Sequence, residues 1–286
     1  MDSKLGLVGA ASNFIAEKCT KGGLVGFYGV GKPGNPDYTE AVGTGFLLRI
    51  CDEVYCVTAR HVLEPESHFD GRVGLSFSCS RMGDAPLMVQ KEQFSQAHTS
   101  HRDDIAAFRL LPVQVAEIKR IGKIAPFELS DFVIRENLGA ENGGYFVTGF
   151  PDSEAQTDEF RRRVDAKMLI YFTAVADTAP TSYQGFDHLR DIGVHFQVDG
   201  NIGHEGQITP SPWPRGASGG PLWAYWEDDS SGIVRQRSGI VGLCRRFEPA
   251  DNMIVATDSK VVLECLASKW SALGEVFDKE FGPWQF

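Results

Sequence analysis

Long hydrophobic runs are missing from this sequence of 286 residues. No segment reaches the roughly 18 consecutive apolar residues that a transmembrane helix needs, so we expect no membrane partner. Basic residues are also scarce, because 28 Lys and Arg stand against 38 Asp and Glu, a net charge of -10. Phosphate binding needs clustered Lys and Arg, so this balance argues against nucleic acid as a partner.

Cysteine is too sparse for a disulfide scaffold, and no C-x-x-C pair is present to bind zinc. The six cysteines are Cys19, Cys51, Cys56, Cys79, Cys244 and Cys265. Cys51 and Cys56 flank an expected hairpin turn, which leaves a disulfide between them open. We favour six unpaired thiols, which are typical of a reducing compartment, and therefore expect a cytoplasmic location.

The N-terminal residues do not favour a signal peptide. The apolar run 5–11 is short, and Asp2 offsets the charge of Lys4. We expect residues 1–23 to be an N-terminal helical extension, with a short amphipathic helix over 5–19.

Glycine and proline are abundant, with 31 and 14 residues, which favours many turns between short strands. Strand candidates in the first half lie at 24–30, 41–50, 53–58, 71–77, 86–90 and 104–111. Those in the second half lie at 144–150, 167–178, 192–198, 220–225, 232–244 and 253–257. We expect the turn-rich stretches 151–165 and 178–191 to be surface loops. The pattern predicts an all-β fold of two six-stranded antiparallel β-barrels, at 24–130 and 131–286.

One helix is expected near the C-terminal end, over residues 259–273. Its apolar residues from Leu263 to Trp270 recur at i, i+3, i+4 and i+7, which makes one stripe for packing onto a barrel. Asp258 or Ser259 can cap its first turn.

Three segments carry residues that are suited to nucleophilic catalysis. Residues 55–63 read YCVTARHVL, and a β-rich run leads to His61. Residues 102–108 read RDDIAAF, with Asp104 at the start of an apolar strand and Asp103 as a rival acid. Residues 214–223 read PRGASGGPLW and hold Ser218 in a glycine-rich turn.

Each of these residue types has a chemical role. A serine hydroxyl is a poor nucleophile unless a neighbouring base accepts its proton, and histidine suits that role because its pKa lies near neutrality. A buried carboxylate fixes the imidazole tautomer and stabilises the imidazolium. Glycines beside Ser218 permit a tight turn and leave backbone N–H groups free to face an oxyanion. The N–H groups of Gly216 and Ser218 are the candidates for this oxyanion hole.

The three segments resemble the signatures of the trypsin/chymotrypsin-like serine protease family, and they occur in that family's order. The GTGF sequence at 43–46 resembles the strand that precedes the histidine in bacterial members. The GFP sequence at 149–151 resembles a turn early in their second barrel. The resemblance covers residues 24–270, approximately, and implies a chymotrypsin-like double barrel.

The resemblance also implies a role for each candidate residue. His61 is the expected general base, Asp104 its orienting carboxylate and Ser218 the nucleophile. Asp104 is preferred to Asp103 because it directly precedes Ile105, as in the family pattern.

Three departures from the family pattern change what is expected. Trypsin-like zymogens carry an acidic residue before the serine, which pairs with a newly cut N-terminus, and Ala217 stands at that position here. We therefore expect no such activation step. Val62 follows the histidine where secreted digestive relatives have a cysteine. The stretch after Trp270 is too short for the PDZ domain of secreted heat-shock relatives, so none is expected.

Substrate preference is predicted from the same resemblance. In the family, the strand after the serine lines the first specificity pocket, and residues 241–244 resemble that strand. The substrate-binding candidates are Arg215, Gly242, Leu243 and Cys244. The expected pocket floor at 211–214 has no acidic residue, so a preference for Lys or Arg is not expected. Arg215, Arg245 and Arg246 either favour acidic or polar substrates or are ordinary solvated charges, and we prefer the second interpretation.

Other patterns are excluded as functional motifs. The G-x-S-x-G of an α/β-hydrolase requires a later histidine, and none follows His204. The glycine-rich stretch at 26–32 resembles a P-loop, but Pro33 stands where Ser or Thr must bind magnesium. His98 and His101 lack the companions of a metal site, so we expect no metal and no cofactor.

The leading hypothesis is a serine endopeptidase that acts through an acyl-enzyme on a protein or peptide substrate. The alternative is a latent or inactive protease-fold module that acts as a binding protein under the control of a regulatory partner. Ala217 and the missing acid of the pocket floor motivate this alternative.

Overall fold

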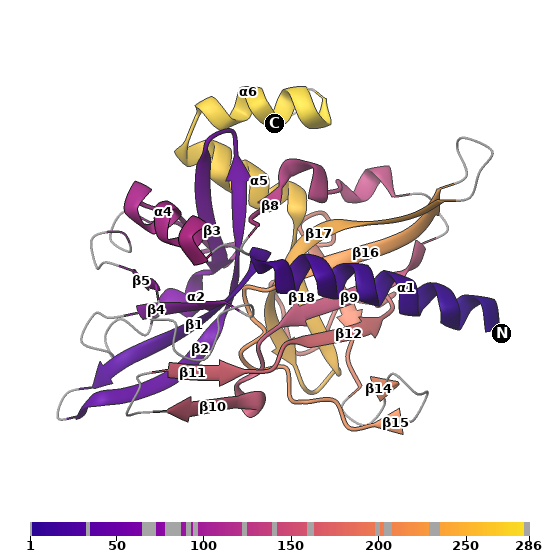
Figure 1. Cartoon of the computed structure of the whole chain (residues 1–286). Helices are drawn as coiled ribbons and strands as arrows, with labels where there is room; N and C mark the ends of the chain where they lie inside the picture. Colours follow the sequence, from indigo (N-terminus) through magenta and orange to yellow (C-terminus); the bar gives the residue numbers. More distant parts are fainter. Residues whose placement is uncertain are drawn as a thin grey trace.

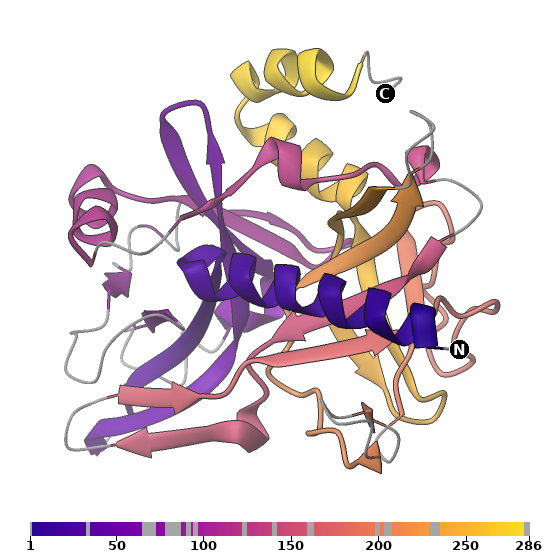
Figure 2. The same ribbon diagram turned by 45° about the vertical axis from the view of Figure 1, so that its right-hand side comes forward.

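The computed structural model describes residues 2–32, 35–64, 73–77, 87–89, 93, 97–121, 125–138, 142–158, 163–197, 201–202, 208–228 and 235–282. Two β-sheets lie beside each other, with helix α1 running across the strands of the second sheet and helices α5 and α6 above the region between the sheets (Figure 1). A view turned by 45° shows the same arrangement (Figure 2). The predicted fold class, an all-β double barrel with terminal helices, is confirmed.

The first sheet contains the six strands that the sequence predicts, and two short ones in addition. Its strands are β1 (Leu24–Lys32), β2 (Asn35–Ile50), β3 (Glu53–Ala59), β4 (Val73–Phe77), β5 (Leu87–Val89), β6 (His98–Ser100), β7 (Ile105–Arg109) and β8 (Phe127–Glu128). The antiparallel order is β5-β4-β1-β2-β3-β7-β6, and β8 pairs with β2 in parallel. Expected strand residues 71–72, 86 and 90, as well as Cys79, lie outside the described residues.

The second sheet is antiparallel throughout and closes on itself. Its order is β12 (Leu169–Thr173), β9 (Asn142–Gly149), β16 (Pro221–Asp228), β17 (Arg235–Glu248), β18 (Met253–Asp258) and β13 (Asp191–His195). The residues after β12 bond to β13 across the two edges, since Ala176 N donates to Gly193 O and His195 N to Ala174 O, at 2.8 and 3.1 Å. These bonds complete the barrel.

One of the two predicted surface loops contains regular structure. Within 151–165, the prediction of a loop is wrong, because β10 (Ala155–Asp158) and β11 (Arg163–Ala166) form a separate hairpin. The strands β14 (Asn201–Ile202) and β15 (Ile208–Thr209) form another small pair. The loop at 178–191 is free of strands until β13 begins.

The structure has more helices than the sequence predicts, and the N-terminal helix is longer than expected. Helix α1 spans Asp2–Lys18 and continues as a π-helical turn over Cys19–Gly23. A four-residue helix, α2, covers Arg60–Leu63, and α4 covers Pro112–Ile121. The single predicted C-terminal helix is two helices, α5 (Ser259–Lys269) and α6 (Ala272–Phe281). The predicted cap is present, since Asp258 Oδ1 accepts from Lys260 N at 2.9 Å.

A hydrophobic core fills each barrel, and a third core joins them. In the joining core, the buried Ala11, Ile15 and Cys19 of the N-terminal segment pack with residues such as Phe46 of β2 and Trp223 of β16. The described cysteines are free thiols, so the disulfide between Cys51 and Cys56 is not formed. No helix among the described residues has the length and apolar character to cross a membrane.

Candidate active site

His61 and Asp104 lie just beyond the paired ends of two neighbouring strands. Strand β3 pairs with β7, and the last register position joins Ala59 to Ile105. His61 follows this position in α2, and Asp104 precedes it in a turn. Antiparallel pairing therefore brings together two residues that are far apart in the sequence.

Both carboxylate oxygens of Asp104 contact His61. The distance from His61 Nδ1 to Asp104 Oδ2 is 2.6 Å, and the backbone N–H of His61 donates to Asp104 Oδ1 at 3.0 Å. The carbonyl of Asp104 also accepts from Arg60 N at 2.9 Å. Because a carboxylate only accepts hydrogen bonds, this contact places the imidazole proton on Nδ1 and leaves Nε2 as the acceptor.

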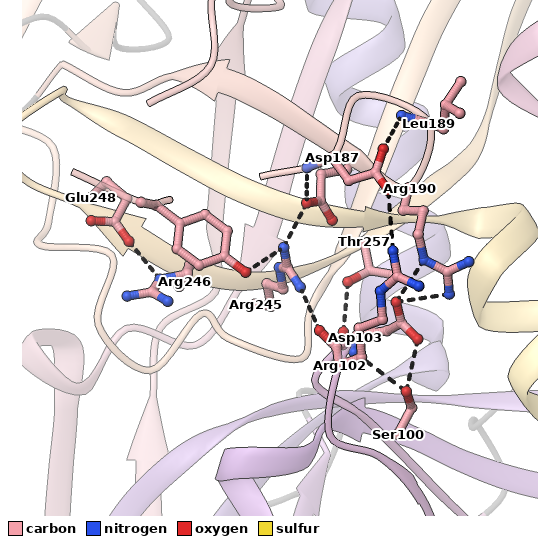
Figure 3. A network of polar contacts seen from close by, with 12 residues as sticks. Ser100, Arg102, Asp103, Asp187, Leu189, Arg190, Arg245, Arg246, Glu248 and Thr257 are labelled. Carbon is pink, nitrogen blue, oxygen red and sulfur yellow. Dashed lines mark hydrogen bonds and ion pairs between the residues drawn. The ribbon is translucent and has the colours of Figure 1, made fainter. Parts of the chain in front are cut away.

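The rival acid, Asp103, is engaged elsewhere. Its carboxylate forms an ion pair with Arg190, at 2.8 Å from Nη2, and accepts from Ser100 Oγ at 2.7 Å. Its carbonyl accepts from Thr257 Oγ1 at 2.8 Å (Figure 3). Arg190 and Thr257 belong to the second half of the chain, so Asp103 links the two barrels and does not contact His61.

The turn that holds Ser218 depends on two glycines in left-handed backbone conformations. The φ angles of Gly216 and Gly219 are 91° and 88°. A Cβ at Gly216 would lie 2.7 Å from Phe150 O, and one at Gly219 would lie 1.9 Å from Thr44 O. Side chains are excluded at both positions by backbone conformation and by space.

The backbone N–H groups of this turn differ in their partners. The N–H groups of Ala217, Gly219 and Gly220 donate to carbonyl oxygens at 2.9, 2.6 and 3.0 Å. Within the described part of the chain, the N–H groups of Gly216 and Ser218 have no such acceptor. These two are the donors that the sequence analysis assigns to an oxyanion hole.

Thr44 of the first sheet holds the serine turn of the second half. Its N–H donates to Ser218 O at 2.8 Å, and its hydroxyl donates to Gly216 O at 2.7 Å. The same hydroxyl accepts from Phe150 N at 2.8 Å. Thr44 is fully buried, and sequence reasoning missed its role, although the GTGF motif contained it.

A cavity of about 590 Å³ is lined by all three triad candidates, His61, Asp104 and Ser218. Among the described residues, the Ser218 hydroxyl forms no hydrogen bond with His61 Nε2. Such contacts are often long in unliganded enzymes and tighten when substrate binds.

Two of the four predicted substrate-binding residues line the cavity. Arg215 and Cys244 are at its wall, whereas Gly242 and Leu243 are not among its lining residues and are buried within β17, with Leu243 in the joining core. Burial raises the pKa of the Cys244 thiol to about 12, so this sulfur is not a thiolate nucleophile beside Ser218. Trp213 and Pro214, from the expected pocket floor, also line the cavity.

The arginines around the cavity were only partly understood from the sequence. Arg215 is exposed and lies 3.2 Å from an Asp152 oxygen. The interpretation of Arg245 as a solvated charge is wrong, because this residue is 3% exposed and its guanidinium pairs with Asp191 at 2.8 Å.

Within the described residues, no group of three or more His, Cys, Asp or Glu side chains is arranged to hold a metal ion.

No family model and no curated protein matches this chain. Solved structures that resemble it include the inactive form of the Rv3671c protease, at 15% sequence identity and a TM-score of 0.44, covering 91% of this chain and 94% of that one. The active form of the same protease from M. tuberculosis matches at 14% identity and a TM-score of 0.40, covering 87% of this chain and 81% of that one. These values describe a distant likeness.

Proposed function

We propose that this chain is a serine endopeptidase with His61, Asp104 and Ser218 as its catalytic residues. The observation that carries the proposal is the pair of contacts between Asp104 and His61 in the wall of the cavity that also holds Ser218. An orienting carboxylate, a base and a nucleophile at one cavity are what acyl transfer requires.

The proposed reaction proceeds in two halves. Ser218 Oγ attacks the peptide carbonyl carbon while His61 Nε2 accepts the hydroxyl proton, and the oxyanion is stabilised by the N–H groups of Gly216 and Ser218. The intermediate collapses, and the amine leaves with the proton from His61. Water then attacks the acyl-enzyme, gives a proton to His61 and releases the carboxylic acid, which restores the Ser218 hydroxyl.

A second candidate is a latent or inactive module that binds a regulatory protein partner. Two observations favour it. Ala217 occupies the position of the activating acid and is buried, and the bond between Ser218 and His61 is not formed in the described residues.

Covalent labelling with a fluorophosphonate probe, read by intact mass, separates the two candidates. We expect one adduct on the wild-type protein and none on Ser218→Ala or His61→Ala. Ser268→Ala is the matched control, because Ser268 Oγ lies 3.0 Å from a histidine nitrogen, Nε2 of His98, but neither residue lines the cavity. This control should keep the adduct. A folded wild-type protein without an adduct would favour the binding module.

A further inference from the structure

The wall of the cavity is strongly basic in a chain that carries a net charge of -10. The described residues that line it include five arginines, two histidines and one acid, Asp104, which is bonded to His61. The arginines are Arg60, Arg102, Arg215, Arg245 and Arg246. Their ion-pair partners lie outside the lining, and these are Glu64, Asp187, Asp152, Asp191 and Glu248. Positive groups clustered in a concave site with low-dielectric walls concentrate the field for a negative ligand.

Arg245 is the buried member of this group. Its side chain and that of Asp191 are each 4% exposed. Its Nη1 makes only a long bond, 3.4 Å, to Arg102 O, and its Nε is buried without a partner among the described residues. Because Nη1 makes only this long bond, the guanidinium keeps donor capacity at the cavity wall, whereas Nε has no surface that a ligand can reach.

Tyr183 orients this arginine and its neighbour. The phenol oxygen lies 3.2 Å from Arg245 Nη2, and the ring centroid lies 5.3 Å from the guanidinium carbon of Arg245 and 4.4 Å from that of Arg246. Figure 3 shows Arg245 between Arg246 and Arg102. The Arg246 side chain is half exposed, so it remains accessible to a ligand. Contact with an aromatic face stabilises such cations and restricts their motion.

Apolar side chains border the basic group. Trp213 and Phe247 stack edge to face, with ring centroids 5.0 Å apart, and both line the cavity with Val147 and Ile254. Such apolar walls lower the local dielectric and strengthen any charged contact beside them.

We propose that this cavity selects peptides that carry an acidic side chain, whose carboxylate is bound by Arg245 and Arg246. The inference rests on the proposed function for its role in cleavage, but the recognition is a property of the cavity itself. Guanidinium groups bind carboxylates through paired, charge-assisted hydrogen bonds, which an amide of the same shape cannot replace.

Binding to the catalytically silent Ser218→Ala protein tests the recognition without turnover. The probe is a fluorescent, alanine-rich peptide with blocked termini and a single central glutamate, and its partner has glutamine at that position. We expect the glutamate peptide to bind at least 10-fold more tightly, with the difference shrinking as salt rises. Equal affinity of the two peptides overturns the inference.

Variants then locate the recognition. Arg246→Gln in the Ser218→Ala background should reduce the preference for glutamate to less than 3-fold. Arg245→Lys should also reduce it, because lysine keeps the charge opposite Asp191 but lacks the planar fork. Arg237→Gln is the matched control, since Arg237 pairs with Asp228 and lies outside the cavity, and it should keep the full preference. If Arg237→Gln loses the preference for glutamate to the same extent as the two cavity variants, the assignment of the carboxylate to Arg245 and Arg246 is overturned.

Two further experiments test whether a terminal carboxylate is the ligand and whether recognition and catalysis are separate. A neutral peptide with a free C-terminus tests whether a terminal carboxylate is the ligand, and tighter binding of this peptide than of the blocked glutamate peptide overturns the side-chain inference. Fluorophosphonate labelling of the wild type tests catalysis separately. An adduct with no glutamate preference contradicts only the recognition, and a preference with no adduct contradicts only the proposed peptidase.

Discussion

At the scale of single residues, the backbone of Asp104 adopts a conformation that few side chains accept. Its φ angle is 54°, in the left-handed region that Asp and Asn tolerate better than most residues. This conformation accompanies the two contacts that its carboxylate makes with the backbone and ring of His61. The orientation of the imidazole therefore depends on one strained turn ahead of β7.

If the proposed triad is correct, Asp104→Asn should lower kcat on peptide substrates by on the order of 10⁴-fold, the loss typical when a triad aspartate becomes asparagine. The amide keeps the shape and tolerates the backbone conformation, but it no longer fixes the imidazole tautomer. Thermal unfolding should change little. Asp103→Asn is the matched control. It breaks the ion pair with Arg190, so it should lower the unfolding temperature while kcat changes little. The reverse pattern would assign the catalytic role to Asp103.

The residues that carry chemistry are predictable from sequence when each lies in its own local motif. The roles of His61, Asp104 and Ser218 stay predictions, but all three lie at one cavity, and each was identified from a motif of ten residues or fewer. Arg245 was misjudged because burial is a property of the packed barrel. Nothing in the local sequence distinguishes it from its exposed neighbour Arg246.

At the scale of elements, the N-cap of α5 combines a helix terminus with burial. Asp258 Oδ1 accepts from Lys260 N, and Arg135 Nε lies 3.3 Å from Oδ2. Burial raises the pKa of the Asp258 carboxyl from 3.8 to about 6, although both neighbours act in the opposite direction. The folded protein therefore holds this proton to a higher pH than the unfolded chain does.

Stability should consequently depend on pH through this cap. Because the folded pKa is the higher one, acidification from pH 7 through about 6 toward 3.8 increases the contribution of Asp258 to the free energy of unfolding. Asp258→Asn keeps an acceptor for the cap and removes the titration. Urea unfolding at several pH values should show that the variant gains stability relative to wild type at pH 7 and loses this advantage near pH 5. A difference that is independent of pH would contradict the raised pKa.

The sequence predicted the strands of the two sheets more completely than the helices and the short, separate strand pairs. Short, mostly apolar strands such as β3, β7 and β18 are recognisable because both their faces are buried. Hairpin β10–β11 was missed because its charged residues resemble those of a loop, and the break at Trp270 was missed because the apolar stripe continues across it.

At the scale of the whole molecule, the site forms only where the two barrels meet. Thr44 comes from the first sheet, yet its backbone and hydroxyl fix the carbonyls of Ser218 and Gly216 in the second half. Hydrogen bonds between the two sheets depend on tertiary packing. The sequence therefore revealed the motif around Thr44 but not its role in holding the serine turn.

Thr44→Val is expected to lower kcat more than it raises KM, because the serine turn loses its support while the cavity walls remain. It also leaves the Phe150 N–H unpaired, at a cost of about 1–3 kcal/mol in the free energy of unfolding. Thr44→Ser restores the hydroxyl and should recover most of kcat. Equal kinetics for the valine and serine variants would show that Thr44 only fills space.

The position of α1 has a consequence for how the chain is made. This helix leaves the ribosome before either sheet, but it contacts β12 and β17, which are synthesised much later. Until those strands emerge, Ala11, Ile15 and Cys19 lack the part of the joining core that the second sheet supplies, such as Trp223. A growing polypeptide of this sequence thus carries a partly uncovered apolar face until β17 emerges, and the joining core cannot complete its packing before the second barrel exists.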